Sequence, residues 1–355
     1  MARVFTRGFE DGEAAFPGDL TSGTHVYNKE SGAVVPALAL SVGDTRSISL
    51  GYASTVCYLY AHIVPQITTY DLLEVYIRIY AAQSYNAYTN TMWLQINDQA
   101  GNELVRLGQD KKIWVLGSVS GDTVASAPFD GSVWARFEFY LEVANPGQLI
   151  IRKNGVVIFS DSYDFTANGA TSVGYVGGHR GESGTLAESF FFDDIAVNDT
   201  TGSNDVSYPG DGRIVGLFPK AVGTNTNMTA YPDSGEDNYE DVDDPATTGN
   251  DGDTTYVTTG ASQSVDTYEF DDLDDNFTIP SSTAISRVTV MSVCRTPTTG
   301  LDIRGVVVDS GTSNGIVVTP EGEASYGING SVVTHPAGSW TVARVNSAEF
   351  GIESI

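Results

Sequence analysis

The stretch WARFEFYLEVANPGQLIIRKNGVVIFSDS, residues 134–162, decides the fold class. Apolar and polar side chains alternate along it, as in Phe137, Glu138 and Phe139, which is typical of a strand with one face on a hydrophobic core. Asn154 and Gly155 interrupt the pattern, and Asn-Gly is the strongest short hairpin signal because both turn positions need a positive φ. The stretch therefore predicts neighbouring antiparallel strands.

The same alternation continues on both sides of this stretch. In LLEVYIRIYAA, residues 72–82, apolar Val75, Ile77 and Ile79 alternate with polar residues, so we expect one face of this strand on the core and the other in water. Further strands are predicted at residues 47–52, 56–64, 91–98, 103–109, 112–117, 172–178 and 189–197. No long stretch shows helical spacing of apolar residues. Residues 1–200 are therefore predicted to form a jelly-roll sandwich.

The second part of the chain has a different composition. A polar stretch rich in Gly and Asp, residues 201–211, lacks periodicity and predicts a linker. Beyond it aromatic residues become sparse, while Asp, Thr and Gly dominate. Strands are predicted at residues 212–219, 254–260, 265–273, 284–296, 301–311, 314–320, 326–336 and 348–355. The whole chain is therefore predicted to be all-β, with a second, smaller β-sandwich at residues 212–355.

The charge and the cysteines narrow the possible partners and environment. A formal net charge of −27 would repel DNA or RNA, so no nucleic-acid partner is expected. The acidic residues concentrate between Asp233 and Asp275, which suits either a solvated loop or a cation site. Cys57 and Cys294 are spaced as isolated buried residues rather than as a disulfide framework. Without an apolar signal segment or an 18-residue apolar span, we expect synthesis in a cytoplasm and no membrane span.

Catalytic motifs are scarce in this sequence. The four histidines show no paired metal-ligand spacing, and no GxSxG or P-loop motif occurs. Glu138 and Glu142 share one face of a predicted strand and are the best candidates for a glycosidase pair, but the ExDxxE pattern of strand-borne glycosidases is absent. We expect both to lie on the solvent side of an outer strand. The sequence thus predicts no catalytic residue and a protein that is not an enzyme.

GFEDGE at residues 8–13 and FFFDDIAVND at residues 190–199 resemble the first and last strands of concanavalin A-like and laminin-G-like jelly rolls. The resemblance implies that these terminal strands lie side by side and share a structural Ca²⁺. By that pattern Glu10, Asp193 and Asp194 would bind the ion, with Asp11 as a further ligand, because calcium prefers carboxylate and carbonyl oxygens. The alternative is that these are turn and edge residues without a metal.

A second resemblance covers the chain from the end of the jelly roll onward. The segments DNYEDVDDPATTGNDGDTTYVTT (237–259), VDTYEFDDL (265–273) and NSAEFGIES (346–354) are similar, in order and spacing, to structural proteins of tailed bacteriophages. This implies a place on the virion surface as a capsid decoration, a neck or head fibre, or a tail fibre. The expected partners are other virion proteins of the capsid, neck or tail, and the resemblance implies a homo-oligomer such as a trimer.

The predicted function is a non-enzymatic component on the exterior of a phage particle, whose jelly roll either binds a host-surface glycan or only stabilises the shell. Aromatic residues available to stack on sugars are Tyr85, Tyr88, Trp93 and Trp114, although aromatic residues of sandwich strands also serve as core. The alternatives are a secreted bacterial carbohydrate-binding module or adhesin, which predicts an export signal, and a polysaccharide-degrading enzyme, which predicts a carboxylate pair.

Overall fold

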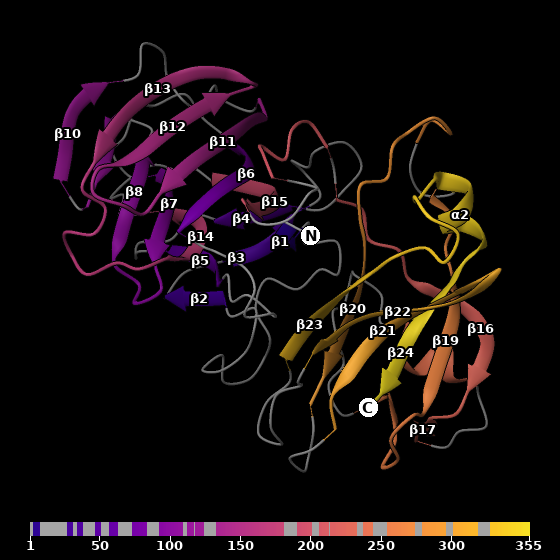
Figure 1. The fold of residues 1–355 in the computed structure, drawn as a ribbon. Helices are drawn as coiled ribbons and strands as arrows, with labels where there is room; N and C mark the ends of the chain where they lie inside the picture. Colours follow the sequence, from indigo (N-terminus) through magenta and orange to yellow (C-terminus); the bar gives the residue numbers. More distant parts are fainter. Residues whose placement is uncertain are drawn as a thin grey trace. The chain divides into compact units, whose positions relative to one another are not determined.

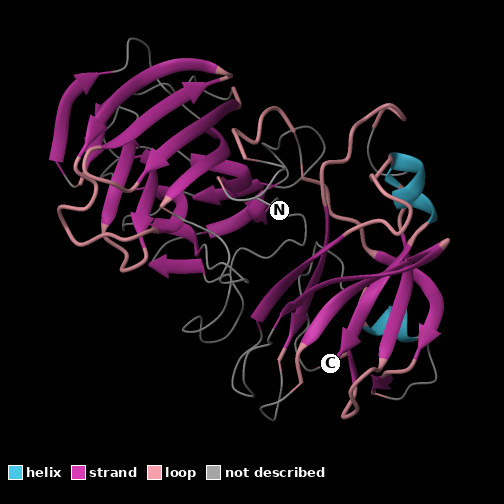
Figure 2. Ribbon diagram, in the orientation of Figure 1, coloured by secondary structure: helices cyan, strands magenta, loops and turns pink. Residues whose placement is uncertain are grey.

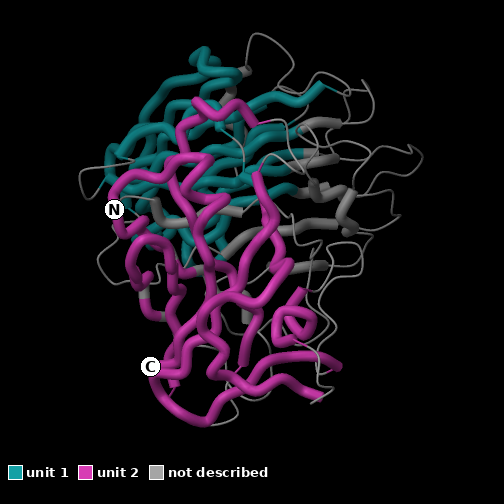
Figure 3. Tube along the Cα trace, turned by 90° about the vertical axis from the view of Figure 1, so that its right-hand side faces the viewer, with its two compact units in different colours: residues 1–10, 24–215 teal, residues 11–23, 216–355 magenta. Residues whose placement is uncertain are grey.

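The structure is a computed structural model of the 355-residue chain, and it is all β apart from short helical turns (Figures 1 and 2). It describes residues 3–7, 27–30, 34–37, 47–50, 57–62, 73–83, 92–108, 112–116, 118–123, 133–180, 190–200, 206–212, 214–232, 237–243, 254–273, 279–295, 301–318 and 327–355. The chain divides into two compact units (Figure 3). Among the described residues, 3–7 and 27–215 belong to the first unit and 216–355 to the second. The predicted fold class is confirmed.

Two antiparallel sheets form the layers of the first unit (Figure 1). The eight-stranded sheet has the order β13 (Val156–Tyr163), β12 (Gly147–Lys153), β11 (Ala135–Glu142), β6 (Glu74–Gln83), β15 (Phe190–Asp199), β4 (Ser47–Leu50) and β3 (Val34–Ala37), with β1 (Arg3–Arg7) also paired to β15. The seven-stranded sheet has the order β10 (Ser118–Thr123), β9 (Lys112–Val115), β8 (Glu103–Gly108), β7 (Met92–Asp98), β14 (Val173–Arg180), β5 (Cys57–His62) and β2 (Tyr27–Glu30).

The terminal strands of this unit are neighbours, as the jelly-roll resemblance implied. Strand β1 pairs antiparallel with β15, so that Arg7 lies opposite Ile195. On its other side β15 pairs with β6, with a bulge between Asp193 and Ala196 that places Asp194 at φ 51°. Such a bulge turns a side chain away from the regular alternation. The two ends of the sequence of this sandwich are thus joined by main-chain hydrogen bonds.

The core of the first unit is the one that alternation predicted. In β6, Val75, Ile77 and Ile79 are fully buried, and in β11 Phe137 and Phe139 are 0% and 1% exposed. The hairpin between β12 and β13 turns at Asn154 and Gly155, whose φ angles of 51° and 82° both lie in the left-handed region. Asn154 also accepts a hydrogen bond from Arg136 N at 2.9 Å, which attaches the turn to β11.

The second unit consists of smaller antiparallel sheets. A five-stranded sheet has the order β16 (Pro219–Thr226), β19 (Val265–Phe270), β24 (Glu349–Ser354), β21 (Ile303–Asp309) and β22 (Gly311–Val318). Two further pairs are β17 (Thr229–Tyr231) with β18 (Tyr256–Thr258), and β20 (Val288–Cys294) with β23 (Gly327–Val333). The described helical elements include the 3-10 turn η1 (Asn238–Asp241) and the helix α2 (Val342–Ser347), whose first turn is capped by Thr341 accepting a hydrogen bond from Arg344 N.

One predicted strand of the second unit is wrong. Residues 212–219 were expected to form it, but the described residues 214–218 are irregular and the strand β16 runs from Pro219 to Thr226. The reason is that a side chain takes the backbone donor there, since Ile214 N donates to Asp194 Oδ1 at 2.9 Å. An N–H bonded to a carboxylate is not available for a sheet ladder.

Candidate functional site

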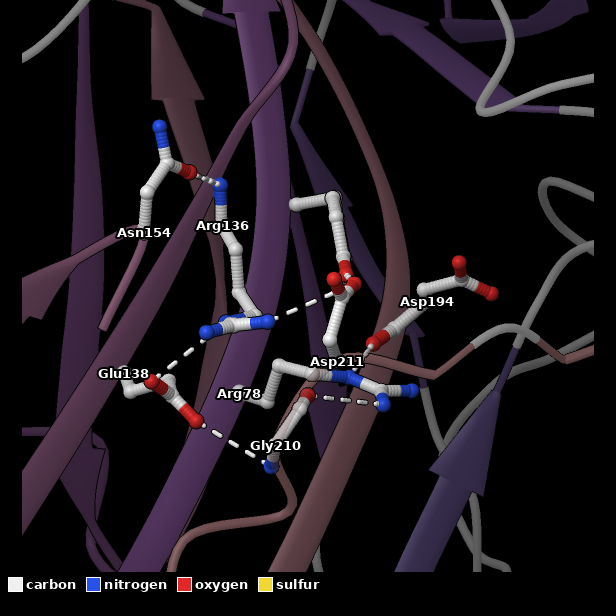
Figure 4. Close-up of polar contacts among 8 residues, drawn as sticks. Arg78, Arg136, Glu138, Asn154, Asp194, Gly210 and Asp211 are labelled. Carbon is white, nitrogen blue, oxygen red and sulfur yellow. Dashed lines mark hydrogen bonds and ion pairs between the residues drawn. The ribbon is translucent and has the colours of Figure 1, made fainter. Parts of the chain in front are cut away.

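Polar side chains of β6 and β11 meet on the outer face of the eight-stranded sheet (Figure 4). Glu138 accepts a hydrogen bond from Gly210 N at 3.1 Å, and its other oxygen lies 3.4 Å from Arg136 Nε. Arg78 donates to the carbonyl oxygen of Gly210 at 3.3 Å. We call this surface, formed by Arg78, Tyr80, Arg136 and Glu138 with residues 208–211 bound on it, the clamped face.

The clamped face ends in a contact between a phenol and a carboxylate. Tyr80 donates its hydroxyl hydrogen to Asp211 Oδ1 at 2.5 Å, and Arg136 Nη1 lies 3.3 Å from the same oxygen. Burial, strengthened by this hydrogen bond, raises the pKa of Tyr80 to about 12. The hydrogen bond from Tyr80 lowers the pKa of the Asp211 carboxyl below its ordinary value.

This geometry corrects two expectations about solvent. The polar side of β6 and Glu138 were predicted to face water, yet Arg78 is 3% and Glu138 2% exposed. Residues 208–211, expected in a linker, lie against this side of the sheet through the contacts given above. Both oxygens of Glu138 therefore have protein partners, and Glu142 accepts a bond from Gln148 N at 3.3 Å. The two carboxylates hold the chain in place and do not form a glycosidase pair.

Two of the four residues of the predicted calcium site are described, and both have protein partners. Glu10 and Asp11 lie outside the described residues. Asp193 Oδ1 accepts a bond from Asp194 N at 2.7 Å, and the Asp194 carbonyl accepts one from Arg78 Nε at 3.2 Å. Within the described ranges no group of three or more His, Cys, Asp or Glu side chains is arranged to hold a metal. Calcium at these residues stays a prediction.

A ladder of side chains runs along β7 on the outer face of the seven-stranded sheet. Trp93 Nε1 donates to Gln95 Oε1 at 2.8 Å, and Gln95 Nε2 donates to Asn97 Oδ1 at 2.8 Å. Leu94 and Ile96, which alternate with them, are each 2% exposed and belong to the core face. Because each amide oxygen in the ladder accepts a bond, the Gln95 and Asn97 amides are each held in one orientation.

Arg106 of β8 lies between two indole rings on this same face. Its Cζ is 4.6 Å from the ring centroid of Trp93 and 5.1 Å from that of Trp114, both within cation–π range. Its Nε donates to Glu103 Oε2 at 2.8 Å, and Nη2 contacts the same oxygen. We call Trp93, Glu103, Arg106 and Trp114 the tryptophan–arginine cluster. The cluster combines a buried indole, a partly exposed indole and a charge-balanced polar group.

The turn between β7 and β8 sets the position of Glu103. Asp98, 1% exposed, accepts bonds from Ala100 N at 2.9 Å and from Asn102 N at 2.8 Å, and Gly101 supplies φ 86°. The register then shifts, because Ile96 pairs with Val105 whereas Asn97 pairs with Glu103. An irregularity of this kind re-aims a side chain, and here Glu103 reaches Arg106 three residues away.

Two of the four predicted sugar-stacking residues are part of this arrangement. Trp93 and Trp114 lie on different strands and both contact Arg106. Tyr85 and Tyr88 lie outside the described residues. The sequence analysis missed Gln95, Asn97, Glu103 and Arg106. The period-two spacing of Trp93, Gln95 and Asn97 could have identified the ladder, whereas Glu103 reaches this face through a register shift that strand alternation does not reveal.

A histidine–carboxylate pair lies among the described residues of the second unit. His335 is 4% exposed, its Nε2 lies 2.7 Å from Asp309 Oδ2, and its Nδ1 accepts a bond from Ala337 N at 3.0 Å. Since Nδ1 accepts, Nε2 carries the proton and donates to Asp309. Both ring nitrogens are therefore occupied by protein partners, which makes this pair a structural bond between β21 and the turn after β23.

No protein-family model and no curated protein matches the chain. Solved structures of low identity do match. An endo-β-1,4-glucuronan lyase from the fungus Trichoderma reesei is 13% identical, with 59% of this chain and 100% of that chain covered and a TM-score of 0.38. A GH131 β-glucanase catalytic domain from Podospora anserina is 14% identical over 58% and 95%, with a TM-score of 0.35. Domain 4 of AbnA, a GH43 extracellular arabinanase from Geobacillus stearothermophilus in complex with arabinotriose, is 13% identical over 56% and 92%, with a TM-score of 0.32.

These matches contradict one prediction. We expected a protein that is not an enzyme, but a lyase and a catalytic domain of a glucanase are among the similar structures. Among the described residues, no helix combines the length and the apolar character needed to span a bilayer.

Proposed function

We propose that the chain is a glycan-binding protein on the exterior of a tailed bacteriophage particle, and that the glycan binds at the tryptophan–arginine cluster. The observation that carries the proposal is Arg106 held between Trp93 and Trp114 beside the amide ladder of Gln95 and Asn97. Sugars expose both C–H faces and hydroxyl groups. Indole rings cover the former, while amide and guanidinium donors bind the latter.

Fixed geometry favours binding at this cluster. Trp93, Gln95 and Asn97 are each less than 10% exposed, so their side chains are held in place, while Trp114 and Arg106 are only partly buried and keep a side accessible. A rigid site loses little conformational entropy on binding. The clamped face differs, because residues 208–211 of the chain already bind its charged groups.

The place on a phage particle rests on the sequence resemblance of the second half of the chain. The segments that carry it include the described parts of β18, β19 and β24, which the structure forms as strands. The expected homo-oligomer and contacts with other virion proteins belong to this proposal. Mass spectrometry of purified particles should find the chain in multiple copies, and particles without it would refute the virion assignment while leaving glycan binding intact.

A glycan array compares the wild-type chain with Arg106→Ala and, as a matched control, Arg152→Ala. Arg152 also lies over an aromatic ring, 3.7 Å from the centroid of Tyr208, but on the eight-stranded sheet. Removing Arg106 deletes two cation–π contacts, so we expect affinity for the bound glycans to fall about 10- to 100-fold. Arg152→Ala should bind like wild type. Equal loss in both variants, or binding by neither wild type nor variants, would contradict the proposal.

A further inference from the structure

A cleft in the second unit lies over β16, β19, β24 and the end of α2. Its volume is about 190 Å³, and the residues that line it include Lys220, Glu269, Phe270, Asn346 and Glu349. Glu269 and Glu349 are direct partners in the antiparallel pair of β19 and β24, so their side chains share one face with Cβ atoms about 5 Å apart. Glu269 is exposed and Glu349 half-buried, so a ligand can reach both carboxylates.

These two carboxylates lack a cation of the protein. Like charges directly opposite each other on a sheet repel and lower stability. Among the described residues, no ion pair involves Glu269 or Glu349. Lys220 lines the cleft, but its Nζ lies 3.3 Å from Asp272 Oδ1.

The same face of β24 also holds a carboxylate that does have a cation. Glu353 lies four residues after Glu349 and opposite Arg304 of β21, whose Nη2 is 2.7 Å from Glu353 Oε2. The difference between the two glutamates is the strand partner, which is an arginine for one and a second glutamate for the other.

Glu349 is held in one position with an oxygen left for a ligand. Its Oε2 accepts bonds from Thr224 N at 2.7 Å, Thr224 Oγ1 at 2.5 Å and Thr267 Oγ1 at 2.8 Å. Burial acts to raise the pKa of the Glu349 carboxyl, but these hydrogen bonds outweigh it and the pKa lies below its ordinary value. No described bond ends at Oε1, and this atom is not cut off from solvent.

We propose that the cleft binds a guanidinium group, such as the head of an arginine side chain. A guanidinium is a planar cation with five N–H donors, so it can bond to two carboxylates at once and lie against the ring of Phe270. A metal ion is a poorer fit, because within the described ranges no three His, Cys, Asp or Glu side chains converge. The site is separate from the proposed glycan site, which belongs to the first unit.

The test compares three capped tripeptides by calorimetry: glycine–arginine–glycine, the same peptide with citrulline, which has the same shape but no charge, and the same peptide with lysine. The wild-type chain should bind the arginine peptide at least about 10-fold more tightly than the citrulline peptide, the worth of one hydrogen bond to a charged group. The lysine peptide should bind more weakly than the arginine peptide, because an ammonium lacks the planar fork. Free arginine identifies the source of the ligand: tighter binding than the capped peptide indicates a small molecule, and weaker binding a side chain of a protein partner.

Equal affinity for the arginine and citrulline peptides, or no binding of any peptide, would overturn the proposal. Equal affinity for the arginine and lysine peptides would overturn the choice of a guanidinium. Each of these results leaves the proposed glycan binding standing.

Two variants and a matched control test the residues. Glu269→Gln and Glu349→Gln each remove one charge, and the amide oxygen of the latter can still accept from Thr224 and Thr267, so each should lose about 10-fold in affinity for the arginine peptide. Glu353→Gln removes a carboxylate from the same face of β24 and should bind like wild type. An equal loss in all three variants, or no loss in the first two, would contradict the proposal.

Thermal melting provides a second measurement. Since Glu269 and Glu349 repel each other in the free protein, Glu269→Gln should melt at a higher temperature than wild type. The arginine peptide should raise the melting temperature of wild type more than that of Glu269→Gln. A lower melting temperature for Glu269→Gln would show that Glu269 already has a cation within the chain, and the proposal would be wrong.

Discussion

The two outer faces of the first unit use the same residue types for different purposes. On the clamped face, Arg78 and Glu138 both bond to Gly210 of the chain itself. In the tryptophan–arginine cluster, Arg106 and Glu103 bond to each other, and the guanidinium lies over two indole rings. Both faces hold buried polar atoms without a hydrogen-bond partner among the described residues, Arg136 Nε on the one and Glu103 Oε1 on the other. The faces differ in cover: residues 208–211 bind the charged groups of the clamped face, whereas Arg106 and Trp114 of the cluster are only partly buried.

The largest effect is expected from breaking the clamped face. Glu138→Ala removes one of the two carboxylates paired with the half-buried Arg136 and leaves Gly210 N without an acceptor. We expect the free energy of unfolding to fall by about 3 kcal/mol, because a hydrogen bond to a buried charged group and an ion pair are lost together. Urea denaturation measures the loss. The folded fraction should keep wild-type glycan affinity, and a selective loss of affinity would show that the clamped face is the binding site.

A smaller loss is expected from the turn that supports the tryptophan–arginine cluster. Asp98→Ala removes the acceptor of Ala100 N and Asn102 N, which should lower the free energy of unfolding by about 2 kcal/mol. Because this turn positions Glu103, which bonds to Arg106, affinity for the bound glycans should fall along with stability. Calorimetry on one folded sample measures both the free energy of unfolding and the affinity for the glycan. If the affinity is unchanged while the free energy of unfolding falls, the turn does not position the binding site.

The phenol of the clamped face should make stability depend on alkaline pH. Tyr80 has a raised pKa in the folded chain, so its contribution is fully present below the ordinary value of 10.0 and is lost as pH rises through about 12. In Tyr80→Phe the free energy of unfolding should fall less steeply as pH rises from 10.0 to about 12, although other buried tyrosines still make it fall. Glycan affinity measured at pH 7 should be the same in wild type and variant. A curve that is equally steep in both would contradict the hydrogen bond to Asp211.

The smallest effect, no change, is expected from a chelator. The described contacts of Asp193 and Asp194 are with N–H donors and Arg78, so EDTA should leave the melting temperature where it was. A fall in melting temperature that Glu10→Ala abolishes would instead establish the calcium site implied by the jelly-roll resemblance.

Sequence periodicity predicted the fold better than it predicted the surfaces. Alternation identified β6 and β11 and their core residues Val75 and Phe137, because one face of each strand must be apolar. It could not show that Glu138 is buried, since the segment that covers it lies 72 residues further along the chain. Alternation also does not reveal the register shift that takes Glu103 to Arg106.

The most direct test of the glycan site uses the four tryptophans of the chain as reporters. Their indole N–H signals in a ¹H–¹⁵N spectrum can be assigned by single Trp→Phe variants, and an oligosaccharide that binds on the array is then titrated in. We predict that the signals of Trp93 and Trp114 shift in saturable fashion while those of Trp134 and Trp340 stay in place. Shifts confined to Trp134 or Trp340, or no shift at saturating ligand, would contradict binding at the tryptophan–arginine cluster.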